Sequence, residues 1–236
     1  MQPTPETLAL AMIWYIVFLF STTCHEAAHA LAAKLGGDPT AFHGGQVTLN
    51  PVPHIQREPF GLVLIPLVSY VYAGWMIGWA SAPYDPAWQR RYPRRAACMA
   101  LAGPAANFTL MLLAAAAIRA GIAIGVFRAP ERITFTHITE AVDPATWGFV
   151  ATLVSVLFLL NLVLGIFNLL PVPPLDGHNG VTLLMRERLA FRFLDATNDP
   201  SFRLMGIFIA WLAFDRVFNP IFSFALNLLY PGASYH

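Results

Sequence analysis

The sequence predicts an all-α polytopic membrane protein with about four to five transmembrane helices, a re-entrant hairpin over residues 60–82 and a short β element near residues 46–49. The first observation is the composition. Of the 236 residues, 57% are hydrophobic and only 11% are charged, whereas soluble domains carry about 25% charged residues. The second is a series of long apolar runs, beginning with seventeen uncharged residues from Leu8 to Cys24. Runs of this length are typical of helices that cross a lipid bilayer.

Composition also excludes other classes of protein. The net charge of +1 gives no reason to expect a nucleic-acid partner. The first residues lack a basic region and no A-x-A cleavage site follows the first apolar run, so this run is expected to be retained as a span. No long polar segment or internal repeat interrupts the chain. Residues 1–236 are therefore expected to form a single membrane-embedded domain.

The first helix is predicted from about Leu8 to Leu35, ending at the glycine pair that follows. The next segment, Asp38–Glu58, contains glycines and prolines and is expected to be a loop with one or two short strands. Within it, Gln46–Leu49 alternates between polar and apolar residues. This alternation is the reason for predicting a short β element there.

Three apolar segments follow. Phe60–Ala82 is interrupted by Pro66, Gly74 and Gly78, whereas Ala96–Ile118 is the clearest full span, with Gly103-Pro104 near its start. A mixed loop leads from there to another span at Trp147–Leu170, which is closed by three prolines.

The last part of the chain holds two further elements. Arg186–Phe193 has the amphipathic pattern of an interfacial helix. Leu204–Tyr230 is apolar around a central Asp-Arg pair and a proline. This pattern fits either one kinked span or two short helices.

The strongest functional signal is His25-Glu26-Ala27-Ala28-His29 inside the first span. Residues four apart share one face of a helix, so His25 and His29 can bind one metal ion together. Glu26 can take a proton from a water that the metal polarises, as in HExxH metallohydrolases. Three ionisable side chains inside a bilayer span are costly and indicate function.

Two histidines leave a catalytic zinc short of a third protein ligand. The best candidate is Asp176, which follows a proline-interrupted segment at the end of an apolar span. Irregular backbone at membrane depth is tolerated where it lines a cavity or is buried in protein. From chemistry alone, an ordinary interfacial turn at Asp176-Gly177 stays open as the alternative.

Together, HExxH at residues 25–29 and N-x-x-P-x(4)-D-G at residues 168–177 resemble the site-2 protease family of intramembrane zinc metalloproteases. The similarity is to the compact bacterial and archaeal branch without PDZ or CBS domains, over roughly residues 10–195. Shorter stretches extend the match: Leu49-Asn50-Pro51 with His54-Ile55, Gly78-Trp79-Ala80, Pro93-Arg94-Arg95 and Gly103-Pro104-x-x-Asn107.

The resemblance implies a zinc metalloendopeptidase that cuts peptide bonds within or near transmembrane segments of membrane-anchored substrate proteins. It implies one catalytic Zn²⁺ bound by His25, His29 and Asp176, with Glu26 as the general base. It also implies that Asn168 holds the substrate backbone or the developing oxyanion.

Three other polar side chains are candidates for lining the site. We group Asn107 with Asn168 as a candidate substrate-binding residue, although an amide inside a span is also expected to hydrogen-bond a neighbouring helix or the motif loop. His54 and His178 lie near the motifs, and we expect them to support the site rather than bind the metal.

Topology gives a separate prediction. Asp176 can reach His25 and His29 only if their two spans run in the same direction, which requires residues 60–82 to enter and leave by one face. One side of the membrane then holds ten basic residues and the other four, whereas two full crossings split the first thirteen 5 to 8. The ten are Lys34, Arg57, Arg90, Arg91, Arg94, Arg95, Arg186, Arg188, Arg192 and Arg203, and the four are Arg119, Arg128, Arg132 and Arg216.

By the positive-inside rule, this split places the active site near the cytosolic face of the cell membrane of a prokaryote. Two other functions stay open. One is a metal transporter whose ion path contains the HExxH residues. The other is a non-catalytic protein that binds membrane helices on the same scaffold.

Overall fold

The computed structural model describes residues 4–197 and 199–232, so the ends of the domain predicted over 1–236 lie outside the described residues. Among the described residues, four helices are long and apolar enough to cross a membrane. These are α1 (Pro5–Gly36), α6 (Pro93–Ala123), α7 (Pro144–Asn168) and α10 (Pro200–Leu229). The protein is therefore an all-α integral membrane protein, as predicted.

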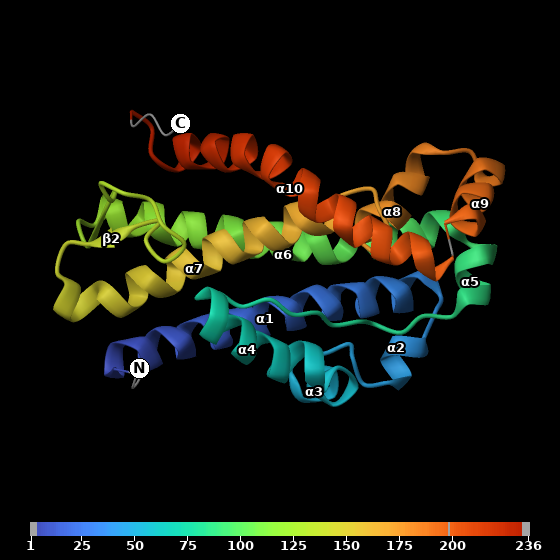
Figure 1. Cartoon of the computed structure of the whole chain (residues 1–236), viewed down its shortest axis with the longest axis horizontal. Helices are drawn as coiled ribbons and strands as arrows, with labels where there is room; N and C mark the ends of the chain where they lie inside the picture. Colours follow the sequence, from blue (N-terminus) through green and yellow to red (C-terminus); the bar gives the residue numbers. More distant parts are fainter. Residues whose placement is uncertain (1–3, 198, 233–236) are drawn as a thin grey trace.

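The four long helices alternate in direction along the bundle. Figure 1 shows α1 and α7 running one way and α6 and α10 running the other. Both α1 and α7 pack extensively against α6. The C-terminal part of α1, which carries His25 and His29, and the C-terminal end of α7, which precedes Asp176, therefore lie at the same end of the molecule, as the sequence required.

The hairpin predicted over residues 60–82 is present. A π-helical turn, η1 (Phe60–Leu64), leads into α4 (Ile65–Ala73), and the chain reverses at Gly74. The φ angle of Gly74 is +75°, a left-handed conformation that costs a residue without Cβ little. An extended segment then returns beside the first arm, where the Trp79 N–H donates to the Gly61 carbonyl at 3.2 Å. It leads to α5 (Pro86–Arg91), as Figure 1 shows.

The β element predicted near residues 46–49 is wrong. Those residues form bends between two short helices, α2 (Thr40–His43) and α3 (Val52–Arg57). A strand needs a hydrogen-bonded partner, and no described segment pairs with this one. The described residues contain one small antiparallel sheet instead, β1 (Phe127–Arg128) with β2 (Glu140–Ala141), inside the segment predicted only as a mixed loop.

The remaining elements lie after α7. They are α8 (Asp176–Gly180), the 3₁₀ turn η2 (Val181–Leu184) and α9 (Glu187–Ala196). Helix α9 occupies the place of the predicted interfacial helix. Residues 204–230 form one helix and not two short ones. They lie within α10, which is continuous and contains Pro220.

Two apolar clusters hold the bundle together. One joins α6 and α7 to the small sheet and α10, with Ile118 and Ile138 fully buried. The other joins α1 to the hairpin and α7 around Trp14, Phe18 and Leu62. Helix α7 is the most buried of the four long helices, and the metal site lies where it meets α1 and α6.

Candidate metal centre

The first two side chains of the site come from one face of α1. Helix α1 is capped by Thr4, whose hydroxyl accepts a hydrogen bond from the Thr7 N–H, and it continues without interruption through the histidine pair. Because His25 and His29 are four residues apart, their rings lie one turn from each other. The two Nε2 atoms are 2.9 Å apart, and both side chains are buried.

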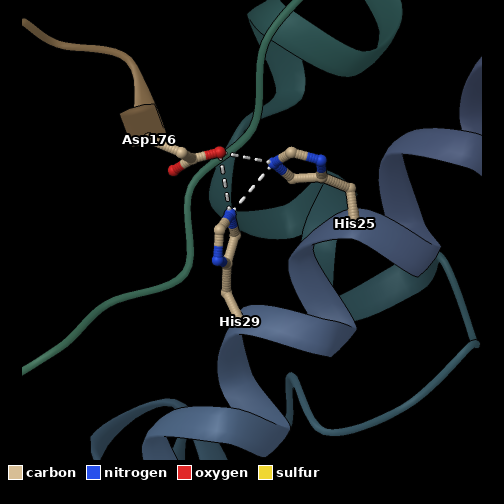
Figure 2. A group of neighbouring side chains, drawn as sticks. All are labelled: His25, His29 and Asp176. Carbon is tan, nitrogen blue, oxygen red and sulfur yellow. Dashed lines mark hydrogen bonds and ion pairs between the residues drawn. The ribbon is translucent and has the colours of Figure 1, made fainter. Parts of the chain in front are cut away.

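The third side chain, Asp176, comes from the far end of the chain. Helix α7 ends at Asn168, and a segment with three prolines leads to Asp176 at the start of α8. The Asp176 Oδ2 atom lies 3.1 Å from His25 Nε2 and 3.3 Å from His29 Nε2. Figure 2 shows the three atoms pointing at one another from the two elements. The structure thus brings together the three predicted metal ligands.

The three facing atoms are all hydrogen-bond acceptors. The His29 Nδ1–H donates to the Met99 carbonyl at 2.8 Å, and the His25 Nδ1–H donates to Asn107 Oδ1 at 2.6 Å. In a neutral imidazole this leaves Nε2 with a lone pair and no proton. Asp176 Oδ2 is also buried and receives no hydrogen bond from the described residues. Three converging lone pairs without a donor repel one another unless a cation lies between them.

The donor set fits a zinc ion. Two imidazole nitrogens and one carboxylate oxygen are the ligands of a catalytic zinc site that keeps one position open. Around a tetrahedral ion at about 2.0 Å from each ligand, neighbouring ligand atoms are about 3.3 Å apart. The observed separations of 2.9, 3.1 and 3.3 Å are close to this value.

Asp176 is held in the ionised form that a metal ligand needs. Burial raises the pKa of the carboxyl, but when His29 and His25 carry a proton on Nε2, as they can without a metal ion, their charge and hydrogen bonds lower the pKa by more. The net result is a pKa well below the usual range of an aspartate.

Helix α6 fits against the histidine pair because of Gly103. A Cβ atom at this position would lie 2.3 Å from His29 Nε2 and 2.5 Å from His25 Nε2. Any side chain there would occupy the space in which the two ligand atoms converge. The adjoining Pro104 lacks an N–H, and Asn107, one turn later on α6, reaches His25.

The other predicted residues have different surroundings. Glu26 is buried, with 5% of its surface exposed, and makes no hydrogen bond or ion pair with the described residues. Asn168 is half-buried at the end of α7, where its amide donates to the Leu164 carbonyl at 3.0 Å. Asn107 is fully buried and is bonded to His25 and to Asn161. The amide of Asn107 is thus engaged within the protein.

Neither His54 nor His178 joins the metal ligands. His54 Nε2 lies 3.1 Å from the Thr48 carbonyl and so ties the bends after α2 to α3. His178 Nε2 lies 2.7 Å from the Thr197 hydroxyl and ties α8 to the end of α9. Burial lowers the pKa of His178, which favours its neutral form. Both residues support the surroundings of the site.

Sequence reasoning missed Asn161, which lies in the middle of α7. Its side chain is fully buried and bonded to Asn107 from α6 and to Ser21 from α1. A signal was present, because an amide inside an apolar span is costly unless it finds partners in the bundle.

The comparisons with known proteins agree with this geometry. The model of the family "Peptidase family M50" matches residues 13–213. The chain is 33% identical over 172 residues to the protein named "Putative zinc metalloprotease YwhC" of Bacillus subtilis strain 168, covering 72% of this chain and 68% of that protein.

It is also 29% identical over 211 residues to the protein named "Putative zinc metalloprotease Rip2" of Mycobacterium tuberculosis strain H37Rv, covering 88% of this chain and 71% of that one. No solved structure matches the chain significantly.

Proposed function

This chain belongs to peptidase family M50, and we propose that it is a zinc-dependent protease that cuts other membrane proteins within or near their transmembrane segments. The observation that carries the proposal is the convergence of Asp176 on His25 and His29 inside a bundle of apolar helices. Glu26, the general base of an HExxH sequence, lies between the two histidines on α1.

Each residue has a chemical role in this proposal. His25, His29 and Asp176 hold the zinc ion, which polarises the attacking water and the substrate carbonyl when it is bound. Glu26 takes the proton of the attacking water on its carboxylate and delivers it to the leaving amine. Asn168 offers its amide to the substrate backbone or the developing oxyanion.

A groove suited to a substrate segment lies beside α1, the helix that carries the HExxH residues. This groove of about 450 Å³ lies between α1, α6 and the bends at residues 47–49. Its lining includes Cys24, which precedes the HExxH residues, Ala28, which lies within them, and Thr109 on α6. The backbones of Val47 and Leu49 make no hydrogen bond with the described residues. An unwound substrate segment can pair with this edge by strand addition.

We propose that the site faces the cytosol of a prokaryotic cell. The helix directions support this proposal, because α5, α9 and the first turns of α6 and α10, which carry most of the ten basic residues of the larger group, lie towards the end of the bundle with α8. Basic residues of this kind gather on the cytosolic side of a membrane.

The test is cleavage of a tagged single-span model substrate in detergent, with the zinc content of each protein measured in parallel. We expect the wild type to cut inside the apolar segment. Glu26→Gln should keep its zinc and lose cleavage, because the variant lacks the base but retains the ligands. A chelator should remove both. A folded, zinc-loaded wild type that cuts none of several substrates would favour a binding or transport protein instead.

A further inference from the structure

We propose that Asn161 is a positioning residue for the metal site, acting through Asn107 to fix which nitrogen of His25 faces the metal. The inference deepens the proposed function because it rests on the zinc site, but it does not depend on proteolysis. Asn161, Asn107 and His25 come from α7, α6 and α1, and all three side chains are buried.

The orientation of the Asn161 amide is set by a backbone group. Its Nδ2 atom lies 2.8 Å from the Leu157 carbonyl oxygen and 2.8 Å from Ser21 Oγ. A carbonyl oxygen only accepts hydrogen bonds, so the atom that faces it must be the nitrogen. Both hydrogens of this nitrogen are then engaged. The oxygen of the Asn161 amide therefore points the other way, towards α6.

This orientation is passed on to Asn107 and then to His25. Asn161 Oδ1 accepts a hydrogen bond from Asn107 Nδ2 at 2.8 Å, so the oxygen of Asn107 faces His25. Since that oxygen can only accept, His25 must carry its proton on Nδ1, with 2.6 Å between the two atoms. The Nε2 lone pair of His25 is then free for the metal, next to Asp176.

The alternative arrangement is costly at this depth. A flipped Asn107 would place its N–H groups against His25 Nδ1–H and its oxygen against Asn161 Oδ1. Each unsatisfied buried polar group costs about 1–3 kcal/mol, and the interior of a membrane protein offers little water to relieve it. The two histidines thus differ: His29 is oriented directly by the Met99 carbonyl, whereas His25 depends on the relay.

The primary experiment uses the metal-free full-length protein labelled with nitrogen-15 at histidine, with the His25 signal assigned by its loss in His25→Gln. In the wild type we expect His25 to be protonated at Nδ1 throughout. In Asn161→Leu, which keeps the branching at Cγ and has no hydrogen-bonding groups, we expect a mixture of protonation sites. Zinc should bind about 10- to 100-fold more weakly to this variant, the usual effect of losing a group that orients a metal ligand.

Two further variants separate positioning from packing. Ser155→Ala also removes buried hydrogen bonds of α7, which Ser155 Oγ accepts from the Ile138 and Thr139 N–H groups, but it should leave zinc affinity unchanged. Asn107→Asp has two oxygens and cannot present a nitrogen to His25, so adding it to Asn161→Leu should restore most of the zinc affinity. A packing defect would not be rescued in this way.

Three results would overturn the proposal. The first is wild-type His25 protonated at Nε2 and not at Nδ1, which can be observed even if Asn161→Leu fails to fold. The second is a folded Asn161→Leu with the zinc affinity of the wild type. The third is equal loss in Ser155→Ala. A wild type that shows the expected His25 state but cleaves nothing would instead contradict only the proposed proteolysis.

Discussion

The two ends of the bundle are held together by different interactions. At the metal end, hydrogen bonds between elements fix single atoms: the Gly36 carbonyl at the end of α1 accepts hydrogen bonds from Trp88 Nε1 at 3.1 Å and from Arg95 at 3.0 Å. At the opposite end, the small sheet and the last turns of α10 pack in an apolar cluster around Ile118 and Ile138. Figure 1 shows the two ends at opposite sides of the view.

This difference indicates that metal binding and folding stability can be changed separately, by substitutions at different ends of the bundle. Polar contacts are directional, so the metal end fixes the orientation of particular atoms. The free energy that apolar packing contributes depends on the buried area and the filled volume, not on the orientation of single atoms. The opposite end therefore mainly stabilises the fold. Substitutions next to the predicted metal ligands should change metal binding, and those at the opposite end should change stability alone.

The largest effect is expected at Gly103. In Gly103→Ala the new methyl group would lie within 2.6 Å of both imidazole rings. We expect the two Nε2 atoms to be forced apart and zinc binding to fall by about 100-fold or more. Zinc affinity measured by chelator competition checks this.

The matched control for Gly103 is Gly148→Ala on α7, where the nearest atom to the new Cβ is 3.9 Å away. It should leave zinc affinity unchanged. Equal affinities for the two variants would show that α6 does not depend on Gly103 for its approach to α1.

The next effect is expected at the opposite end. Ile118 is fully buried in the apolar cluster, so Ile118→Ala should destabilise the fold by about 3 kcal/mol through lost packing. Zinc affinity of the folded protein should be unchanged. Thermal unfolding in detergent measures the first quantity, with Ile124→Ala at an exposed site as the control. A loss of zinc affinity in folded Ile118→Ala would contradict the claim that substitutions at the opposite end change stability alone.

The smallest effect is expected at Asp38, just beyond α1. Burial raises the pKa of Asp38, but hydrogen bonds from Thr40 and from the Asp85 N–H lower it by more. A depressed pKa in the folded state stabilises the protein above the unfolded pKa, about 3.9, and this stabilisation is lost as the pH falls through the folded value.

Asp38→Asn should therefore lower the free energy of unfolding by about 1 kcal/mol at pH 7. The difference from the wild type should shrink below about pH 4. Unfolding at several pH values measures it. A deficit that stays constant down to pH 3 would show that the charge of Asp38 is unimportant.

The three residues that converge in the candidate metal centre could be predicted from sequence because their chemistry is unusual for their surroundings. An HExxH sequence in an apolar span is costly without a function, and Asp176 follows a segment with too many prolines for a regular helix. The requirement that Asp176 reach the histidines also predicted the hairpin correctly.

Other features depend on contacts between distant segments. Residues 46–49 alternate like a strand but have no partner in the fold. The role of Asn161 depends on Ser21 and Asn107, which lie 140 and 54 residues away in the chain. A pattern within one segment does not contain that information.

The most direct test of the metal centre is zinc K-edge X-ray absorption on the purified protein, comparing the wild type with Asp176→Ala. The structure predicts one zinc per chain with nitrogen and oxygen ligands at about 2.0–2.2 Å, two of them imidazoles, and weaker zinc binding in the variant. A sulfur ligand at about 2.3 Å, which would have to come from a cysteine such as Cys24, would contradict the account. So would a wild-type spectrum that Asp176→Ala leaves unchanged.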